Sequence, residues 1–203
     1  MGRIYLIRHG QTTWNSAASY AGSTDVPLND QGIAQAVTVA DRLESLPIKA
    51  VFSSGLSRAV DTARIIAERF GLIVTQIPEL NELDYGDWEG MPEIEVPVRY
   101  PRLFTAWRAN PAEISTPGGE TFGQLCERAL PALLRIAEEN RGRDIVVVAH
   151  KSTNRALICC LTGRNVNEYR QVGQDNTAIN ILESGEDGRV RVEQVNLTDH
   201  LSS

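Results

Sequence analysis

Two of the chain's three histidines, His9 and His150, each directly follow an apolar run. A neutral imidazole is a good nucleophile near pH 7, so His9 could attack a phosphorus atom and carry the phosphoryl group as phosphohistidine. Arg8 and Arg58 carry planar guanidinium groups whose paired N–H donors match phosphate oxygens. If the fold brings these four side chains together, His150 and the arginines can stabilise the charge on a dianionic phosphoryl group.

Transfer of a phosphoryl group from an ester also requires a proton for the leaving oxygen. A carboxylic acid held near the site can supply that proton. The segment 79–90, ELNELDYGDWEG, offers Glu82 as the candidate and Asp84 as the alternative. The residue types alone leave both open.

The elements that must position these residues alternate between strand and helix. Short apolar runs at 3–8, 49–53 and 144–149 predict buried strands, and each leads into a helical pattern. This order is typical of a largely parallel sheet covered by helices on both faces. Ligands bind beyond the carboxyl ends of such strands, where His9 and His150 are expected. The helical patterns are Ile33–Val37–Ala40–Leu43, Ala59–Ala63–Ile66–Phe70 and Phe122–Cys126–Ala129–Leu133.

Three other segments have their own signals. Pro131 lies inside the third helical pattern, so we expect it to kink or break that helix. The tail, 178–184 and 189–197 around GEDG, predicts an antiparallel hairpin at a sheet edge. Segment 85–120 is rich in Gly, Pro and Trp, and we expect a lid-like insertion over the active face.

The 203 residues fit a single domain, 1–203. The composition also limits the classes of molecule that this domain is expected to bind. A net charge of −6 argues against nucleic-acid and anionic-membrane partners but leaves a small anion open. Three cysteines without metal-type spacing predict reduced core thiols, and the N-terminus lacks a secretory pattern, so we expect a cytoplasmic protein. A homodimer stays open.

Six segments resemble the histidine phosphatase superfamily, the phosphoglycerate mutase-like group. LIRHGQTTWN is similar to its signature R-H-G-[E/Q]-[S/T]-x-W-N, and the others follow in family order: GSTDVPLNDQGIAQA, VFSSGLSRAVDTA, LNELDYGDWEG, PGGET and VVAHKSTNRAL. The resemblance spans nearly the whole chain. It implies a three-layer α/β/α sandwich with a mostly parallel central sheet and an antiparallel edge, and no metal or organic cofactor.

The resemblance also implies roles for individual residues. His9 matches the phosphorylated nucleophile, and Glu82 matches the proton donor, which favours it over Asp84. The implied phosphate pocket consists of Arg8, Arg58 and His150. The implied substrate-binding residues are Asn15, Thr12, Gly22 and Lys151. Lys151 is a departure, because many relatives carry glycine at this position.

The function we expect is that of a metal-independent phosphomonoesterase acting on a small phosphorylated metabolite. The tail resembles that of the metal-independent phosphoserine phosphatases of this superfamily and, less fully, that of phosphatases acting on phosphoglycerate derivatives. Some phosphoserine-specific relatives, however, have histidine in place of Tyr85. One alternative is a cofactor-dependent phosphoglycerate mutase, but resembling mutases have a longer insertion and tail. Another is a non-catalytic phosphate-sensing or interaction domain, whose mark would be loss of His9 or Glu82. Whether Tyr85 or His200 contacts the substrate stays open.

Overall fold

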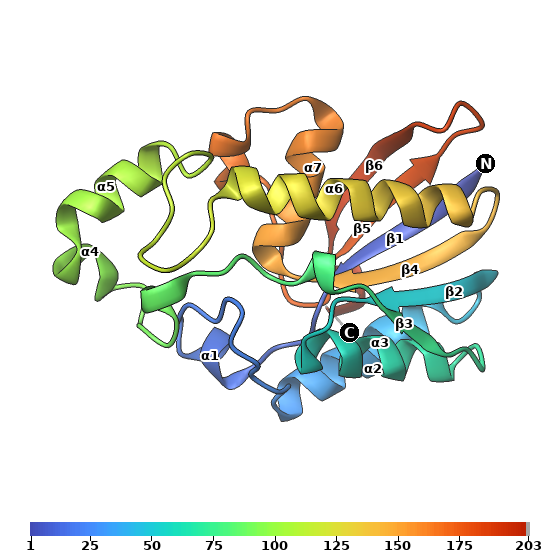
Figure 1. Ribbon diagram of the computed structural model, residues 1–203. Helices are drawn as coiled ribbons and strands as arrows, with labels where there is room; N and C mark the ends of the chain where they lie inside the picture. Colours follow the sequence, from blue (N-terminus) through green and yellow to red (C-terminus); the bar gives the residue numbers. More distant parts are fainter. Residues whose placement is uncertain (202–203) are drawn as a thin grey trace.

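A computed structural model describes residues 1–201, which fold around one six-stranded sheet (Figure 1). The strand order across the sheet is β3-β2-β4-β1-β5-β6. The strands are β1 (Gly2–Arg8), β2 (Ile48–Ser53), β3 (Val74–Gln76), β4 (Asp144–Ala149), β5 (Ile179–Ser184) and β6 (Val190–Leu197).

The sheet is parallel in its first four strands and antiparallel at one edge. β1 pairs with β4 in parallel, as β2 does with β4 and β3, whereas β5 pairs antiparallel with both β1 and β6. The predicted mostly parallel sheet and the C-terminal hairpin are therefore confirmed. β3 was not predicted, because its three residues are too short for a periodic signal.

Helices cover both faces of the sheet, as the α/β/α prediction requires (Figure 1). α2 and α3 pack on one face around Val39, Ala63 and Ile66, and α6 and α7 pack on the other around Leu125 and Leu157. The helices are α1 (Thr13–Ser16), α2 (Asp30–Leu43), α3 (Ser57–Glu68), α4 (Val96–Arg99), α5 (Pro101–Ala109), α6 (Phe122–Glu139) and α7 (Lys151–Thr162), with short 3-10 segments η1 (Pro78–Leu80), η2 (Gly86–Trp88), η3 (Val166–Gln171) and η4 (Asp199–Leu201).

The position of β4 follows from its sequence, DIVVVA. Five of its six residues are buried, and β1 and β2 flank it on either side. The sequence of a strand that is covered on both faces is a continuous apolar run, because neither face of the strand contacts water. The end of this strand is thereby fixed in the middle of the sheet, and His150 follows directly as the N-cap of α7.

The expected break at Pro131 is wrong. α6 continues through Pro131 from Phe122 to Glu139 (Figure 1). Proline removes one backbone donor, but the apolar side of α6 buries a long row of side chains, and its start is fixed by a capping box in which Thr121 and Gln124 bond reciprocally. Burial along the helix outweighs the single lost hydrogen bond.

Segment 85–120 forms η2, α4, α5 and their connections, which extend to one side of the sheet (Figure 1). Trp88, Val96 and Trp107 from this segment are buried and belong to the same core cluster as α6 and α7. Its aromatic residues therefore anchor it to the domain core, while its movement as a lid stays a prediction.

The other expectations concern the cysteines and the membrane. Within residues 1–201, Cys126, Cys159 and Cys160 are free, and only Cys159 is fully buried. Among these described residues, no helix combines the length and the apolar character that crossing a bilayer would require.

Candidate active site

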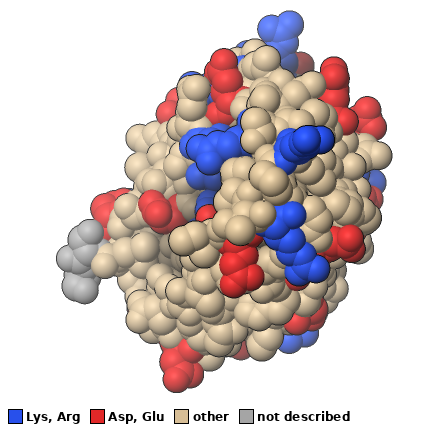
Figure 2. Space-filling model, turned by 90° about the vertical axis from the view of Figure 1, so that its left-hand side faces the viewer, with Lys and Arg blue, Asp and Glu red and all other residues tan. Residues whose placement is uncertain are grey.

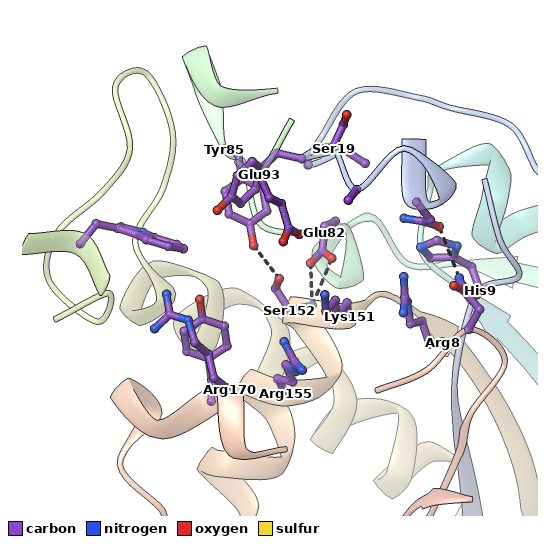
Figure 3. A pocket seen from close by; sticks show the side chains of 18 of the residues that line it. Arg8, His9, Ser19, Glu82, Tyr85, Glu93, Lys151, Ser152, Arg155 and Arg170 are labelled. Carbon is purple, nitrogen blue, oxygen red and sulfur yellow. Dashed lines mark hydrogen bonds between the residues drawn. The ribbon is translucent and has the colours of Figure 1, made fainter. Parts of the chain in front are cut away.

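A cavity of about 620 Å³ opens beyond the carboxyl ends of β1 and β4 (Figure 3). The sequence-predicted residues that line it are Arg8, His9, Asn15, Gly22, Arg58, Glu82 and Lys151. Figure 2, which views the side where α4 and α5 lie, shows Lys and Arg side chains gathered around a hollow in the surface. A ligand would enter between these cations.

The two histidines meet, although 141 positions separate them in the sequence. Their ring centroids lie 5.1 Å apart with the planes inclined at 57°. His9 Nδ1 lies 2.6 Å from the carbonyl oxygen of Gly10, and a carbonyl can only accept, so Nδ1 carries the proton. His9 Nε2 therefore keeps its lone pair, which a nucleophile requires.

The ring of His150 is held from both nitrogens. Nε2 lies 2.6 Å from Ser54 Oγ, and Arg58 Nε donates to Nδ1 across 3.2 Å. Because Arg58 can only donate, Nδ1 accepts, and the proton of the neutral ring lies on Nε2 and is donated to Ser54. The imidazole is thus fixed in both tautomer and orientation beside His9.

Arg58 is fully buried in the first turn of α3 and is oriented by a loop. Nη1 donates to the Thr24 carbonyl at 2.8 Å and Nη2 to the Gly22 carbonyl at 2.7 Å. Glu89 holds that loop by accepting hydrogen bonds from the backbone N–H groups of Ser23 and Thr24. Gly22 has φ of +52°, and a Cβ there would lie 1.9 Å from Glu89 Oε1, so any other residue would be strained and would displace the Glu89 carboxylate.

Arg8, the last residue of β1, is also buried. Nη1 donates to the backbone carbonyl of Gln174 at 2.8 Å, while Nε is buried and has no partner among the described residues. Neither Arg8 nor Arg58 takes part in an ion pair within residues 1–201. An unpartnered buried donor beside two imidazoles is what an anion would satisfy.

Burial lowers the pKa values of the two arginines and the two histidines, and neighbouring positive charges lower those of Arg8 and both histidines further. Burial lowers the pKa of Arg8 to about 10, and that of Arg58 is also lowered by its burial. The pKa values of His9 and His150 lie well below their usual value, first through burial and then through the charge of Arg58. Both imidazoles are therefore neutral near pH 7, which suits His9 for attack on phosphorus.

Glu82 lies across the cavity from His9, and Figure 3 shows its carboxylate next to the start of α7. Oε1 accepts from the backbone N–H of Leu83 at 2.9 Å and of Thr153 at 3.2 Å, and Oε2 accepts from that of Ser152 at 3.1 Å. Asp84, the alternative acid, does not line the cavity, because its side chain accepts from the Gly86 N–H in a turn. The geometry therefore favours Glu82.

The four expected substrate-binding residues separate into two groups. Asn15, Gly22 and Lys151 line the cavity. The structure does not bring Thr12 there: its buried hydroxyl caps α1 by accepting from the Asn15 N–H. Thr12 thus positions Asn15, whose side-chain oxygen accepts from the Thr12 N–H and from Asn176.

The sequence left open whether Tyr85 and His200 contact the substrate, and the structure shows where each side chain lies. Tyr85 lines the cavity, and its hydroxyl lies 2.9 Å from Ser152 Oγ. His200 is buried outside the cavity lining, with Nε2 3.4 Å from Thr177 Oγ1. Thr177 in turn donates its N–H to the Arg8 carbonyl, so His200 supports the backbone behind the site.

The family model of the histidine phosphatase superfamily (branch 1) matches residues 4–198. The chain belongs to this superfamily. It is 31% identical over 201 residues to phosphoserine phosphatase 1 of Hydrogenobacter thermophilus, covering 99% of this chain and 95% of the relative. It is 39% identical over 163 residues to the metal-independent phosphoserine phosphatase of Arabidopsis thaliana, covering 78% and 68%.

A solved structure shares the fold of this chain. Phosphoserine phosphatase from Entamoeba histolytica, in complex with 3-phosphoglyceric acid, superposes with a TM-score of 0.89 at 27% identity, covering 99% of this chain and all of the other. The α/β/α architecture derived from the strand and helix pattern is the architecture of this superfamily.

Several contributors to the site were missed by sequence reasoning. Ser54 and Glu89 stand inside the matching motifs VFSSGLSRAVDTA and LNELDYGDWEG, so their positions were visible but their roles were not. Gln174 and Asn176 belong to a loop after η3 that carries no periodic signal. The cavity lining also includes Arg155 and Arg170, two cations that look in sequence like ordinary solvated side chains.

Proposed function

We propose that this protein is a phosphoric monoester hydrolase that acts on a small phosphorylated metabolite through a phosphohistidine at His9. The observation that supports it best is the pair of neutral imidazoles, 5.1 Å apart, beside two buried guanidinium groups that take part in none of the described ion pairs. Relatives and structural neighbours named as phosphatases support the same reaction class.

In the first step, His9 Nε2 attacks the phosphorus atom while the bond from phosphorus to the ester oxygen breaks. Arg8 and Arg58 stabilise the charge on the non-bridging oxygens, and the free Nε of Arg8 gains a partner. His150 donates its N–H to Ser54 and contributes by accepting from Arg58 Nε, which orients that guanidinium group. Glu82, in its acid form, gives its proton to the leaving oxygen. The product alcohol leaves, and the phosphoryl group stays on His9.

In the second step, water attacks the phosphohistidine. Glu82, now a carboxylate, takes a proton from that water, the bond from phosphorus to Nε2 breaks, and inorganic phosphate leaves. His9 returns to its neutral state with the proton still on Nδ1, where Gly10 accepts it. No metal is needed for this sequence, and a relative named as metal-independent supports that part of the proposal.

Segment 85–120 forms much of the outer wall through Glu93, Pro97, Phe104 and Trp107, and we propose that it acts as the lid. The mutase alternative is not favoured, since phosphatases predominate among the relatives described above. The interaction-domain alternative is not favoured either, because both His9 and Glu82 are present in the cavity.

The finer proposals concern substrate and setting. We propose phosphoserine or a phosphoglycerate derivative as the substrate class to test first, because relatives are named for the former and one neighbour holds 3-phosphoglyceric acid. We also propose a cytoplasmic location, tested by fractionation of the source cells, and leave a homodimer to be tested by light scattering of the purified chain.

The experiment is release of p-nitrophenol from p-nitrophenyl phosphate in the presence of a chelator, with the His9→Ala variant as the blank. We expect release by the wild type and a loss of at least about 10³-fold in the variant, as for removal of a covalent nucleophile. Absence of release would refute the phosphatase, and release only with added metal would refute the metal-free mechanism. Conversion of 3-phosphoglycerate to 2-phosphoglycerate tests the mutase.

A further inference from the structure

The cavity is larger than a phosphate site alone. Its volume of about 620 Å³ lies in the range of sites for whole small molecules, about 300–1,000 Å³. Arg8, His9 and Arg58 line one end of the cavity, and His150 packs beside His9 without lining it. Much of the remaining wall comes from segment 18–22, α7, η3 and segment 85–120 (Figure 3). The outer part of the cavity must therefore receive the rest of the substrate.

Three cations line this outer part: Lys151 and Arg155 from α7, and Arg170 from η3. All three are half-buried, and none of them takes part in an ion pair within residues 1–201. In Figure 3, Lys151 lies between the Arg8–His9 end and the pair Arg155 and Arg170. Half-buried cations without a counter-ion are unusual in a chain with a net charge of −6.

The charges on the whole cavity wall are strongly unequal. Its carboxylates are Glu82, which hydrogen-bonds to the start of α7, and Glu93, which is exposed and in no described ion pair. The cations on the wall are Arg8, Arg58, Arg108, Lys151, Arg155 and Arg170. One dianionic phosphoryl group occupies Arg8 and Arg58 and leaves the outer cations without a partner.

Two of the outer guanidinium groups are held in place by neighbours that leave N–H groups free. Arg170 lies over the rings of Tyr169, at 4.5 Å, and Trp107, at 5.0 Å, and one of its nitrogens donates to the Arg108 carbonyl. Arg155 Nε donates to the Val172 carbonyl at 2.7 Å. Side chains restrained in this way lose less conformational entropy when they bind an anion.

Lys151 shows the same lack of a counter-charge. Its pKa is lowered first by burial and then by the positive charges of Arg8 and Arg155, with Glu93 and Glu82 acting in the opposite direction. Lys151 and Arg155 are four residues apart on α7, so they lie on the same face of the helix, one turn from each other. The two cations can therefore bind a single anionic group together.

We propose that Lys151, Arg155 and Arg170 form a second anion subsite, and that the substrate is a phosphomonoester with a further anionic group, a carboxylate or a second phosphate, at its distal end. This inference rests on the proposed phosphatase function. It narrows the substrate class, because phosphorylated compounds whose remaining part is neutral leave these cations unpartnered.

The test compares substrates that differ only in the distal group: phenyl phosphate, 4-carboxyphenyl phosphate and 1,4-phenylene bisphosphate. We expect kcat/KM of the wild type to be at least about tenfold higher for one or both anionic compounds than for phenyl phosphate, since charge-assisted hydrogen bonds are gained. The better of the two identifies the second group as carboxylate or phosphate. In Arg155→Gln, Arg170→Gln and Lys151→Gln we expect this preference to fall by roughly tenfold or more, mainly through KM.

The control is Arg102→Gln on α5, which removes one exposed positive charge outside the cavity lining and should leave the preference as in the wild type. Thermal unfolding identifies any variant that has lost its fold, and the other two variants then carry the test. Hydrolysis of all three compounds at equal kcat/KM, or an equal preference in folded variants, would overturn the subsite alone. Hydrolysis of none of them would overturn the phosphatase proposal itself.

Discussion

The substitution Glu82→Gln tests whether Glu82 donates a proton to the leaving oxygen or has only a structural role. Glutamine has nearly the same shape, but its amide cannot release a proton to a leaving oxygen. We expect kcat/KM on an alkyl phosphate such as glycerol 3-phosphate to fall by about 10²–10⁴, the usual contribution of a positioned acid. p-Nitrophenolate needs little protonation to leave, so the loss on p-nitrophenyl phosphate should be far smaller.

The structural cost of the same change follows from the contacts of Glu82. Oε1 accepts from the N–H groups of Leu83 and Thr153, and a glutamine oxygen can keep both bonds. The amide nitrogen would then replace Oε2 and face the Ser152 N–H, which in the wild type donates to Oε2 at 3.1 Å and to Oε1 at 3.2 Å. Loss of that bond costs about 1–3 kcal/mol, and each kcal/mol lowers Tm by about 2–4 °C in a domain of this size, so the variant should stay folded.

The assay is therefore the ratio of kcat/KM on the two substrates, measured for wild type and variant at one pH. A large increase in the p-nitrophenyl phosphate to glycerol 3-phosphate ratio supports proton donation. Equal losses on both substrates would refute it, because a distorted pocket has no reason to distinguish leaving groups. Asp84→Asn is the matched control: Asp84 lies outside the cavity lining, and the ratio should not change.

Three further changes test the rest of the site. Incubation with ³²P-labelled substrate and rapid quenching should label the wild-type chain and leave His9→Ala unlabelled; a labelled variant would place the covalent intermediate elsewhere. His9 and His150 have folded pKa values well below 6.5, so the unfolded chain binds more protons at acidic pH; stability is fully present above pH 6.5 and is lost as the pH falls below it. NMR titration of the imidazole resonances should find both midpoints below 6.5, and a midpoint at or above 6.5 for either residue would contradict the assigned burial. Ser54→Ala leaves the buried His150 Nε2–H without its partner at 2.6 Å, and we expect about 1–3 kcal/mol of lost stability in urea unfolding together with a drop of about tenfold in kcat/KM; wild-type values in both measurements would show that Ser54 does not position the ring.

The phosphate end of the site was predictable because its two histidines, His9 and His150, directly follow strands in the sequence. A buried β-branched run such as that before His150 fixes both a strand and the point where the chain reaches water. Parallel strands place such ends on the same edge of a sheet, so His9 and His150 were expected to meet, and their rings do. The apolar runs that predict these strands therefore also predict where His9 and His150 lie in the folded protein.

The outer cations were not predictable for the opposite reason. Arg155 stands on a mostly buried helix, and Arg170 lies in a short 3-10 segment, and neither position has a periodicity that marks a cavity. Their environment is set by aromatic residues far away in sequence, such as Trp107, which stacks with Arg170. Lys151 was noticed only because relatives differ there. Partners brought by tertiary packing leave no local signal in a single sequence.

The pKa shift of His9 has two causes that behave differently once substrate is bound. Its imidazole is kept neutral first by burial and then by the charges of Arg58 and Arg8. A bound phosphate dianion offsets those positive charges, so their effect on the nucleophile is largely cancelled in the complex. Burial is not cancelled, because a substrate that fills the cavity excludes more water. In the proposed mechanism, the aromatic wall of segment 85–120 therefore has a chemical effect as well as a protective one: by keeping water out, it keeps His9 neutral and able to attack.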